Sequence, residues 1–390
     1  MEIALKSIFW LSLSALAYTY FGYPLLVSAL VAFKKKRALS VSPADTEEYP
    51  LVSLMIPAYN EEAIIRRKID NSLELDYPPS RLEIVVASDG STDRTNAMLK
   101  SYSRNEIRAI VYRKREGKTA VINKTIPKLM GDIVVLSDAS AMLAPDAIKR
   151  IIEHFKDPGV GCVSGKYILG NGDQSNRGKG EGLYFRYESF LKSKESKFNS
   201  ILGAHGSLYA IRKALFQPLG KEIINDDYII PMQVVAQGYR SVYAQDALSV
   251  EVAGTTIAGE AVRRKRINMG NVQQLVVLRN LLNPRQGKIA FQFISHKLLR
   301  LLSPLFLLLL LSTGALAGGA LYRTFFILQL IFHGLGLVNW YLEKRSAQLR
   351  LLFIPFYFTF GMWTIISGLY GYLRQERSTL WERPDAHPVA

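Results

Sequence analysis

The sequence has one cysteine and lacks several motifs that would fix a reaction class. Because Cys162 is the only cysteine among 390 residues, the chain forms no internal disulfide, which suits a reducing compartment. No C-x-x-C, H-E-x-x-H, G-x-S-x-G or G-x-x-x-x-G-K-[ST] pattern occurs, so zinc, serine-hydrolase and P-loop chemistries have no support. No G-x-G-x-x-G follows the first strand-like run, which disfavours a nicotinamide enzyme.

Charge is absent from four long stretches of the chain. Residues 8–33, 301–321, 324–342 and 351–373 contain no Asp, Glu, Lys or Arg, and each is near or above the roughly 20 residues that cross a bilayer as a helix. We therefore expect a membrane protein with about four spans. The first stretch is too long for a signal peptide, and its basic cluster comes after it. Uncharged spans also disfavour a transporter, which needs ionisable groups along an ion path.

Basic residues predict the orientation of these spans. Lys and Arg outnumber Asp and Glu by 49 to 33, and Lys34, Lys35, Lys36 and Arg37 directly follow the first span. The positive-inside rule then places the following segment in the cytoplasm. We expect a multi-pass protein of the cell's inner (plasma) membrane in which about residues 34–300 are cytoplasmic. Charge gathered at membrane edges favours anionic membrane lipid, and not nucleic acid, as a partner.

The region between the first and second spans alternates strand-like and helix-like segments. Apolar runs at about 52–57, 82–88, 107–112 and 132–137 alternate with helical patterns at about 61–73, 92–103, 117–130 and 145–155. This order predicts βαβ units and a Rossmann-like α/β domain with a mostly parallel, doubly wound sheet. Ligands of such sheets bind beyond the carboxyl ends of the strands, so the ends of these runs are the candidate site.

Acidic residues follow two of the predicted strands. Asp89 in "VVASDGSTD" and Asp138 in "VVLSDAS" each come directly after an apolar run, with no basic residue beside either in the sequence. An ordinary strand–turn–helix cap explains Asp89 taken alone. Two carboxylates at one sheet edge nevertheless cost electrostatic free energy unless they share a ligand or cation. This pair favours a site for a nucleotide sugar and its metal.

An ordered set of motifs resembles the family 2 glycosyltransferases of the GT-A fold. The motifs are "PAYNEE", "SDGSTD", "REGKTAVIN", "LSDAS", "LGAHGSLYAIRKALF", "INDDYIIPMQVVAQGYR" and "RRKRINMGNVQ". Their order is similar to that of the membrane-integrated branch, which includes cellulose, hyaluronan and poly-N-acetylglucosamine synthases. The resemblance implies an inverting transfer of a hexose from a UDP-sugar to a polysaccharide, with a membrane lipid of ceramide or diacylglycerol type as the alternative acceptor.

The resemblance also implies residue roles at the donor side. It assigns the nucleotide to Pro57, Ala58, Tyr59, Asn60, Glu61 and Asp89, and a cationic role near it to Lys118; a solvated surface lysine is the alternative for Lys118. Asp138 matches the first acid of the D-x-D motif, whose carboxylates hold Mg²⁺ or Mn²⁺ against the diphosphate. The third position of this motif is Ser140, a weaker and neutral ligand.

On the acceptor side the resemblance implies a catalytic base, Asp227, in "NDDYIIP". An inverting transferase needs a carboxylate to take the proton of the attacking hydroxyl. The spacing to "GYR" selects Asp227 over Asp226, although either could instead cap the helix expected at about 228–237. His205 lies in the acceptor loop, where a contact with the acceptor and a purely structural role both remain open.

A basic motif follows the predicted catalytic domain. Arg263, Arg264 and Arg266 match the Q/R-x-x-R-W motif, for which the resemblance implies contact with the diphosphate and acceptor; a helix lying on anionic lipid is the alternative. Ile267 replaces the family's Trp, which leaves less surface for sugar stacking. We therefore divide the chain into an N-terminal anchor (1–37), a GT-A domain (50–256), basic interfacial helices (257–300), three spans (301–373) and a tail (374–390).

Overall fold

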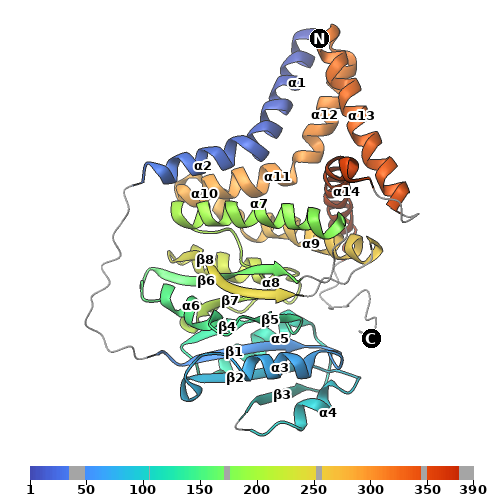
Figure 1. Cartoon of the computed structure of the whole chain (residues 1–390). Coiled ribbons are helices and arrows are strands. Elements are labelled where there is room, and N and C mark those ends of the chain that lie inside the picture. Colours follow the sequence, from blue (N-terminus) through green and yellow to red (C-terminus); the bar gives the residue numbers. More distant parts are fainter. Residues whose placement is uncertain (35–48, 105, 171–175, 252–256, 344–348, 377–390) are drawn as a thin grey trace. The chain divides into compact units, whose positions relative to one another are not determined.

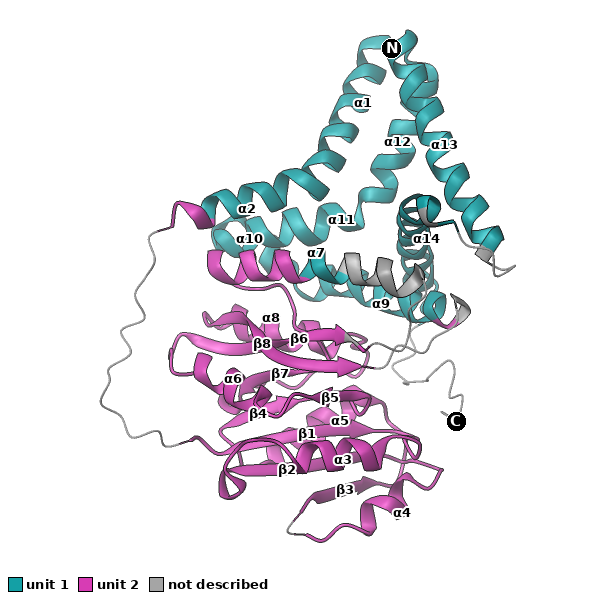
Figure 2. Ribbon diagram, in the orientation of Figure 1, with its two compact units in different colours: residues 1–30, 173–188, 260–376 teal, residues 31–172, 189–259, 377–390 magenta. Residues whose placement is uncertain are grey.

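The structure is a computed structural model that describes residues 1–34, 49–104, 106–170, 176–251, 257–343 and 349–376. Three of the four basic residues used for the orientation argument (Lys35, Lys36 and Arg37) lie outside these ranges, as does most of the 374–390 tail. The chain divides into two compact units, coloured separately in Figure 2. We call residues 1–30, 173–188 and 260–376 the helical unit, and residues 31–172, 189–259 and 377–390 the sheet unit.

The sheet unit is built on one mixed sheet of eight strands, in the order β3-β2-β1-β4-β7-β6-β8-β5 (Figure 1). The strands are β1 (Val52–Ala58), β2 (Leu82–Asp89), β3 (Arg108–Tyr112), β4 (Ile133–Leu136), β5 (Ala141–Leu143), β6 (Val160–Leu169), β7 (Tyr209–Arg212) and β8 (Arg240–Glu251). The β1–β2, β1–β4, β2–β3 and β6–β8 pairs are parallel, and the pairs involving β7 or β5 are antiparallel. The predicted α/β class with a mostly parallel sheet is confirmed.

Four helices of this unit alternate with the early strands as the sequence predicts, and a fifth, α8, follows β7. They are α3 (Ile65–Leu73), α4 (Thr95–Lys100), α5 (Lys118–Thr125), α6 (Ala147–His154) and α8 (Asp226–Ala236). A further helix, α7 (Asn176–Phe198), belongs partly to each unit. Each predicted strand and helix has a counterpart here, and α3, α4, α5 and α6 are shorter than expected.

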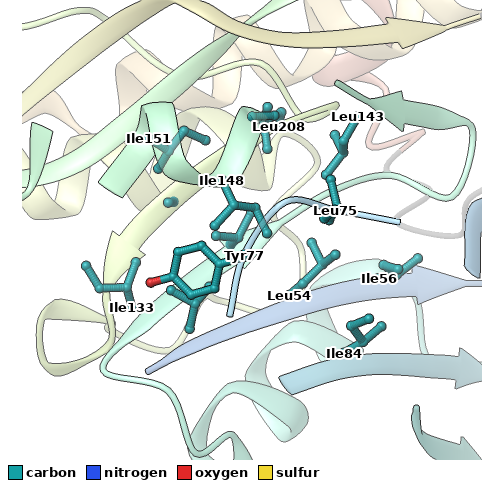
Figure 3. Close-up of a cluster of buried hydrophobic side chains, with 14 of the residues drawn as sticks. Leu54, Ile56, Leu75, Tyr77, Ile84, Ile133, Leu143, Ile148, Ile151 and Leu208 are labelled. Atoms are coloured by element: carbon teal, nitrogen blue, oxygen red, sulfur yellow. The ribbon is translucent and has the colours of Figure 1, made fainter. Parts of the chain in front are cut away.

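The core explains why the first strand is apolar throughout. All seven residues of β1 are buried, because β1 lies between β2 and β4 and is covered on both faces. On one face Leu54 and Ile56 meet Ile84 of β2 together with Ile148 and Ile151 of α6 (Figure 3). The buried sheet therefore fixes the positions at which β1, β2 and β4 end. The polar residues directly after those ends are held in place as a result.

The helical unit carries the apolar helices. It contains all or most of α1 (Glu2–Ala17), a π-helical turn (Tyr18–Gly22), α2 (Tyr23–Ala32), α9 (Ile257–Val277), α10 (Lys288–Gln292), a second π-helical turn (Phe293–Leu298), α11 (Leu299–Leu301), α12 (Ser303–Leu316), α13 (Ala320–Glu343) and α14 (Phe353–Leu373). Within the described residues, three helices are long and apolar enough to cross a membrane: Glu2–Ala32, Ala320–Leu342 and Phe353–Leu373. A fourth candidate is the pair Lys288–Leu301 and Ser303–Leu316, which bends by 57°. The expected span at 301–321 thus corresponds to a bent candidate that begins earlier, at Lys288, and ends at Leu316.

Candidate active site

The ends of β1 and β2 are locked together by hydrogen bonds between their loops. Asn60 adopts a left-handed backbone (φ 52°), and its side-chain oxygen accepts from the amide of Thr92 at 2.8 Å. The amide of Asn60 donates to Ser91 Oγ at 3.1 Å, and that of Glu61 donates to Thr95 Oγ1 at 2.8 Å. The two motifs "PAYNEE" and "SDGSTD" therefore form one structural feature at the predicted edge of the sheet.

The remaining predicted donor residues lie at the same edge. Pro57 and Ala58 are buried at the end of β1, where they pair with Ala87 and Ser88 of β2. Tyr59 is half-buried, and the Arg115 guanidinium carbon lies 3.9 Å from its ring centroid, a cation–π arrangement. The structure brings these residues together, and their contact with a nucleotide stays a prediction.

Asp89 holds the loop that leads to Lys118 through two hydrogen bonds. Its two carboxylate oxygens accept from the amides of Glu116 (2.8 Å) and Gly117 (2.7 Å). The next residue, Gly90, has φ +64°, and a Cβ there would lie 2.7 Å from the amide nitrogen of Arg115. Only glycine fits this approach. Asp89 thus positions the "REGK" motif, whatever further contact it makes with a ligand.

Lys118 joins two of the predicted acidic residues. Its ammonium nitrogen lies 2.8 Å from Asp138 Oδ1 and 3.3 Å from Asp226 Oδ2, and the Lys118 side chain is 14% exposed. The solvated-lysine alternative is therefore wrong. Burial alone would lower the pKa of Lys118, but the charges of Asp138 and Asp226 raise it well above the ordinary lysine value. The amine stays protonated as a fixed cation at the edge of the sheet.

The Lys118–Asp138 contact also corrects the expectation that Asp138 has no basic residue near it. The sequence places no basic residue beside Asp138, yet Lys118 reaches it from α5, 20 positions away. Asp138 is therefore partly neutralised before any ligand binds. Among the described residues no group of three or more His, Cys, Asp or Glu side chains gathers in a manner that would hold a metal.

Asp227 and Asp138 approach each other across Gly206. The Gly206 amide donates to Asp227 Oδ2 at 3.1 Å. A Cβ added to Gly206 would lie 3.2 Å from Asp227 Oδ2 and 3.1 Å from Asp138 Oδ2, so both oxygens border the same point. Burial, and then the nearby charge of Asp226, raise the pKa of Asp227 to about 6. A carboxylate with such a pKa suits proton abstraction near neutral pH.

Capping does not explain the acidic pair. The cap position of α8 is Asn225, which makes no side-chain cap hydrogen bond. Asp226 instead pairs with Lys118 and accepts a 3.4 Å hydrogen bond from the Tyr209 hydroxyl, while Asp227 accepts from Gly206. The two neighbouring acids therefore have separate environments, one inside an ion pair and one facing Gly206.

His205 precedes that glycine in a loop fixed by several hydrogen bonds. The His205 amide donates to Ser164 Oγ at 3.0 Å, and the Ala204 amide donates to the Asp227 carbonyl at 2.8 Å. The ring of His205 is stacked with that of Tyr167, with 6.3 Å between centroids and an angle of 29°. The loop that carries His205 thus contacts the predicted base through its backbone, and a contact of the imidazole with an acceptor stays a prediction.

The three predicted arginines lie on α9, in the helical unit. A buried carboxylate, Glu260, accepts from Arg263 Nε at 2.8 Å and from Arg264 Nε at 2.6 Å. The Arg264 guanidinium also lies 4.5 Å from the ring centroid of Tyr357 on α14. Arg264 therefore links two helices of its own unit. A contact of Arg263, Arg264 or Arg266 with a diphosphate stays a prediction.

Sequence reasoning missed a buried lysine and a glutamate near Asp138. Lys68 of α3 is fully buried, and its ammonium donates to Ser137 Oγ at 2.7 Å. Glu251, the last residue of β8, accepts a hydrogen bond from the hydroxyl of Ser140. No local motif marks either residue, because both come to Asp138 from elements distant in the sequence.

Comparison with known proteins identifies the family of this site. The model named glycosyltransferase-like family 2 matches residues 50–270, more than half of the chain. The chain belongs to this family. The matched range contains the described strand ends, the Asp138–Lys118 pair and Asp227, which agrees with the predicted family resemblance.

The names of similar proteins include synthases of different products. A β-monoglucosyldiacylglycerol synthase of Synechocystis is 28% identical over 48% of this chain, which spans 41% of that protein, less than half its length. A poly-β-1,6-N-acetyl-D-glucosamine synthase of Staphylococcus aureus is 25% identical over 72% of this chain and 66% of that one. A probable glycosyltransferase of Bacillus subtilis, YdaM, is 25% identical over 86% of each chain.

A solved structure supports the fold. The mannosyltransferase PcManGT of Pyrobaculum calidifontis, in complex with GDP-Man and Mn²⁺, superimposes with a TM-score of 0.69 and 24% identity, covering 95% of this chain and 99% of that one. At this identity the likeness concerns the fold alone. The GT-A fold of the family 2 transferase, accompanied by candidate membrane helices, is thereby confirmed.

Proposed function

We propose that this family 2 glycosyltransferase is an inverting enzyme that moves a hexose from a UDP-sugar to a membrane-associated acceptor. The observation that supports it most strongly is the convergence of Asp138 and Asp227 on Gly206. One carboxylate follows β4 at the donor edge, and the other, Asp227, lies in the first turn of α8 with a pKa raised to about 6. A donor-side acid and an acceptor-side base are the two groups that this reaction requires.

The proposed step is a single displacement. The acceptor hydroxyl attacks the anomeric carbon, Asp227 takes the hydroxyl proton, and the bond from the anomeric carbon to the diphosphate oxygen breaks. The new glycosidic bond forms on the face opposite the departing UDP, which inverts the anomeric configuration. Lys118 is a fixed positive charge beside Asp138, and it stabilises negative charge that develops on the diphosphate.

A divalent cation fits the acidic residues of this edge. Carboxylate and hydroxyl oxygens are the donors that Mg²⁺ and Mn²⁺ prefer, and Asp138 with Ser140 and Glu251 offers only such donors. When bound, the ion would neutralise charge on the leaving diphosphate. Lys118 and Asp227 keep the roles given above, since neither depends on the ion's position.

The acceptor we favour is a growing polysaccharide of the cell surface. The ordered motifs resemble those of polysaccharide synthases, and the poly-N-acetylglucosamine synthase matches the longer part of this chain. A lipid acceptor is the second candidate. It is favoured by the similarity to glucosyldiacylglycerol synthases and by Ile267, which offers no aromatic surface where the resembled motif has Trp.

We further propose that the sheet unit lies on the cytoplasmic side of the inner (plasma) membrane. The candidate membrane helices support attachment to a membrane, and the basic residues after the first span support this side. UDP-sugars are then supplied from the cytoplasm.

The test is a donor and product assay on the full chain in lipid. Radiolabelled UDP-glucose, UDP-N-acetylglucosamine, UDP-galactose and GDP-mannose are incubated with the protein, and the products are divided into solvent-extractable and polymer fractions. We expect label to move from one of the UDP-sugars into the polymer fraction. Label in the solvent-extractable fraction alone would select the lipid acceptor, and use of GDP-mannose alone would overturn the UDP assignment.

A further inference from the structure

The incomplete acidic motif is approached by a carboxylate from another strand. Ser140 occupies the third position of the motif that begins with Asp138, and its hydroxyl donates to Glu251 Oε1. The register of the antiparallel β5–β8 pair causes this contact, because Ala141 lies opposite Glu251. The end of β8 therefore delivers an acid to the position at which the motif has a neutral hydroxyl.

Lys68 shows that the two acids act on one region. Its buried ammonium donates to Ser137 Oγ and to the Ala141 carbonyl, two groups that flank the motif. Burial lowers the pKa of Lys68 to about 7, and attraction by Asp138 and by Glu251 opposes that effect. The Lys68 ammonium therefore lies at the segment that carries Asp138, to which Ser140 also holds Glu251 from more than 100 residues away.

Each carboxylate retains one oxygen for a ligand. Asp138 Oδ1 accepts from Lys118, and Oδ2 is the atom that borders Gly206. Glu251 Oε1 accepts from Ser140. Among the described residues, none donates a hydrogen bond to Asp138 Oδ2 or to Glu251 Oε2. The set of donors is all oxygen and doubly acidic, which suits a Mg²⁺ or Mn²⁺ ion that keeps waters and diphosphate oxygens as its other ligands.

We propose that Glu251 supplies the second metal-binding carboxylate, in place of the Asp that the motif lacks, and that Ser140 orients it. The inference rests on the proposed function, which requires a metal beside the diphosphate. It moves half of the metal site from the loop after β4 to the end of β8, so the site depends on the pairing of β5 with β8.

The experiment measures Mn²⁺ binding alone, by the electron paramagnetic resonance signal of free Mn²⁺ over the full-length protein in lipid nanodiscs. Glu251→Gln keeps the side-chain shape and an oxygen for Ser140, but removes the charge. We expect the Mn²⁺ dissociation constant to rise by about tenfold or more. Glu153→Gln, an exposed site on α6, is the matched control and should leave it unchanged.

A charge-relocation variant makes the test independent of folding defects. Ser140→Asp combined with Glu251→Gln returns the missing carboxylate to the motif itself, and we expect Mn²⁺ affinity to recover to within a few fold of wild type. Wild-type affinity in Glu251→Gln would overturn the proposal. So would a double variant that binds as weakly as Glu251→Gln while it unfolds at the wild-type temperature.

This result is separable from the proposed function. If the donor assay found no transfer from any nucleotide sugar, the proposed function would fail, while dependence of Mn²⁺ binding on Glu251 would still be measured. Conversely, robust transfer with a Mn²⁺ affinity insensitive to Glu251→Gln would overturn only the assignment of Glu251.

Discussion

The amide of Gly206 donates to Asp227 Oδ2 at 3.1 Å, so the residue that contacts this carboxylate has no side chain. The hydrogen bond favours the ionised carboxylate, and the missing Cβ leaves the space between Asp227 and Asp138 unfilled by protein. Both properties belong to the backbone at this position. The close approach of the Gly206 backbone therefore helps to set the separation of the Asp227 and Asp138 carboxylates.

Gly206→Ala tests this space directly. The backbone of Gly206 is not left-handed, so alanine is conformationally allowed, but its Cβ would lie 3.1 and 3.2 Å from two carboxylate oxygens. We expect folding to survive and turnover to fall by about a hundredfold as the carboxylates are displaced. Gly220→Ala is the control, because its Cβ would meet only Ile223 at 3.9 Å. Equal turnover of the two variants would contradict this account of the site.

Asp227→Asn separates catalysis from structure. The asparagine oxygen still accepts from Gly206, so UDP binding and thermal stability should stay near wild type, while turnover falls by roughly a hundredfold or more. Binding is measured by calorimetry and turnover by UDP release. Asp226→Asn should weaken the pairing with Lys118 and cost less turnover than Asp227→Asn. Near wild-type turnover of Asp227→Asn would remove Asp227 as the base.

The pH profile should report Asp227. Its pKa is raised to about 6 by burial and by Asp226, and only the deprotonated form accepts a proton. We therefore expect kcat/KM to rise with pH through about 6 and to level off above that value. Initial rates at low donor concentration in lipid measure the profile. A rate independent of pH between 5 and 8 would disagree with a titrating base.

The neighbouring acid offers a control for that assignment. Asp226 is the second cause of the raised pKa of Asp227, and its neutralisation in Asp226→Asn removes a repulsive charge. The rise of kcat/KM with pH should then occur at lower pH, since Asp227 holds its proton less tightly without the charge of Asp226. A rise that moved to higher pH, or stayed in place, would assign the titration to another group.

The predicted topology can be tested by thiol labelling. Residues 343–350 are expected inside the cell, and, with four spans, residue 386 outside; both positions fall largely or wholly beyond the described ranges. Cysteines at Ser346 and Ala386 are introduced in a Cys162→Ser background and exposed to an impermeant maleimide. We expect labelling at 386 only. Native Cys162 is fully buried, so background reaction should be low in any case. Labelling at position 346 would show that the predicted orientation is wrong.

The sequence was sufficient to predict the parallel half of the sheet. Continuous apolar runs such as Val52–Ala58 and Leu82–Asp89 are typical of strands buried on both faces, and turn residues separate them from the helices. The other half was not predicted. In that half, β5 has three residues and β7 four, too few for a periodic signal. The helix α7 was also not predicted, because its three glycines between residues 178 and 182 lower its helix propensity.

The candidate site shows the same division. Asp138 and Asp227 were found because each stands in a local motif. Two contacts depend on which strands lie side by side: the pairing of Lys118 with Asp138 and the approach of Glu251 to Ser140. Strand order cannot be predicted from any short stretch of sequence. Local chemistry could thus be predicted, whereas the electrostatic partners required the fold.

The bent fourth candidate span has a consequence for the membrane itself. α12 has 14 residues, about 21 Å of helix, against roughly 30 Å of hydrocarbon in a typical bilayer. α12 alone falls several ångströms short of that thickness, so the span needs either the residues before the bend or a locally thinner bilayer. Acyl-chain length is therefore expected to act on this enzyme as a physical variable, with bilayers of shorter chains stabilising α12 and thicker ones opposing it.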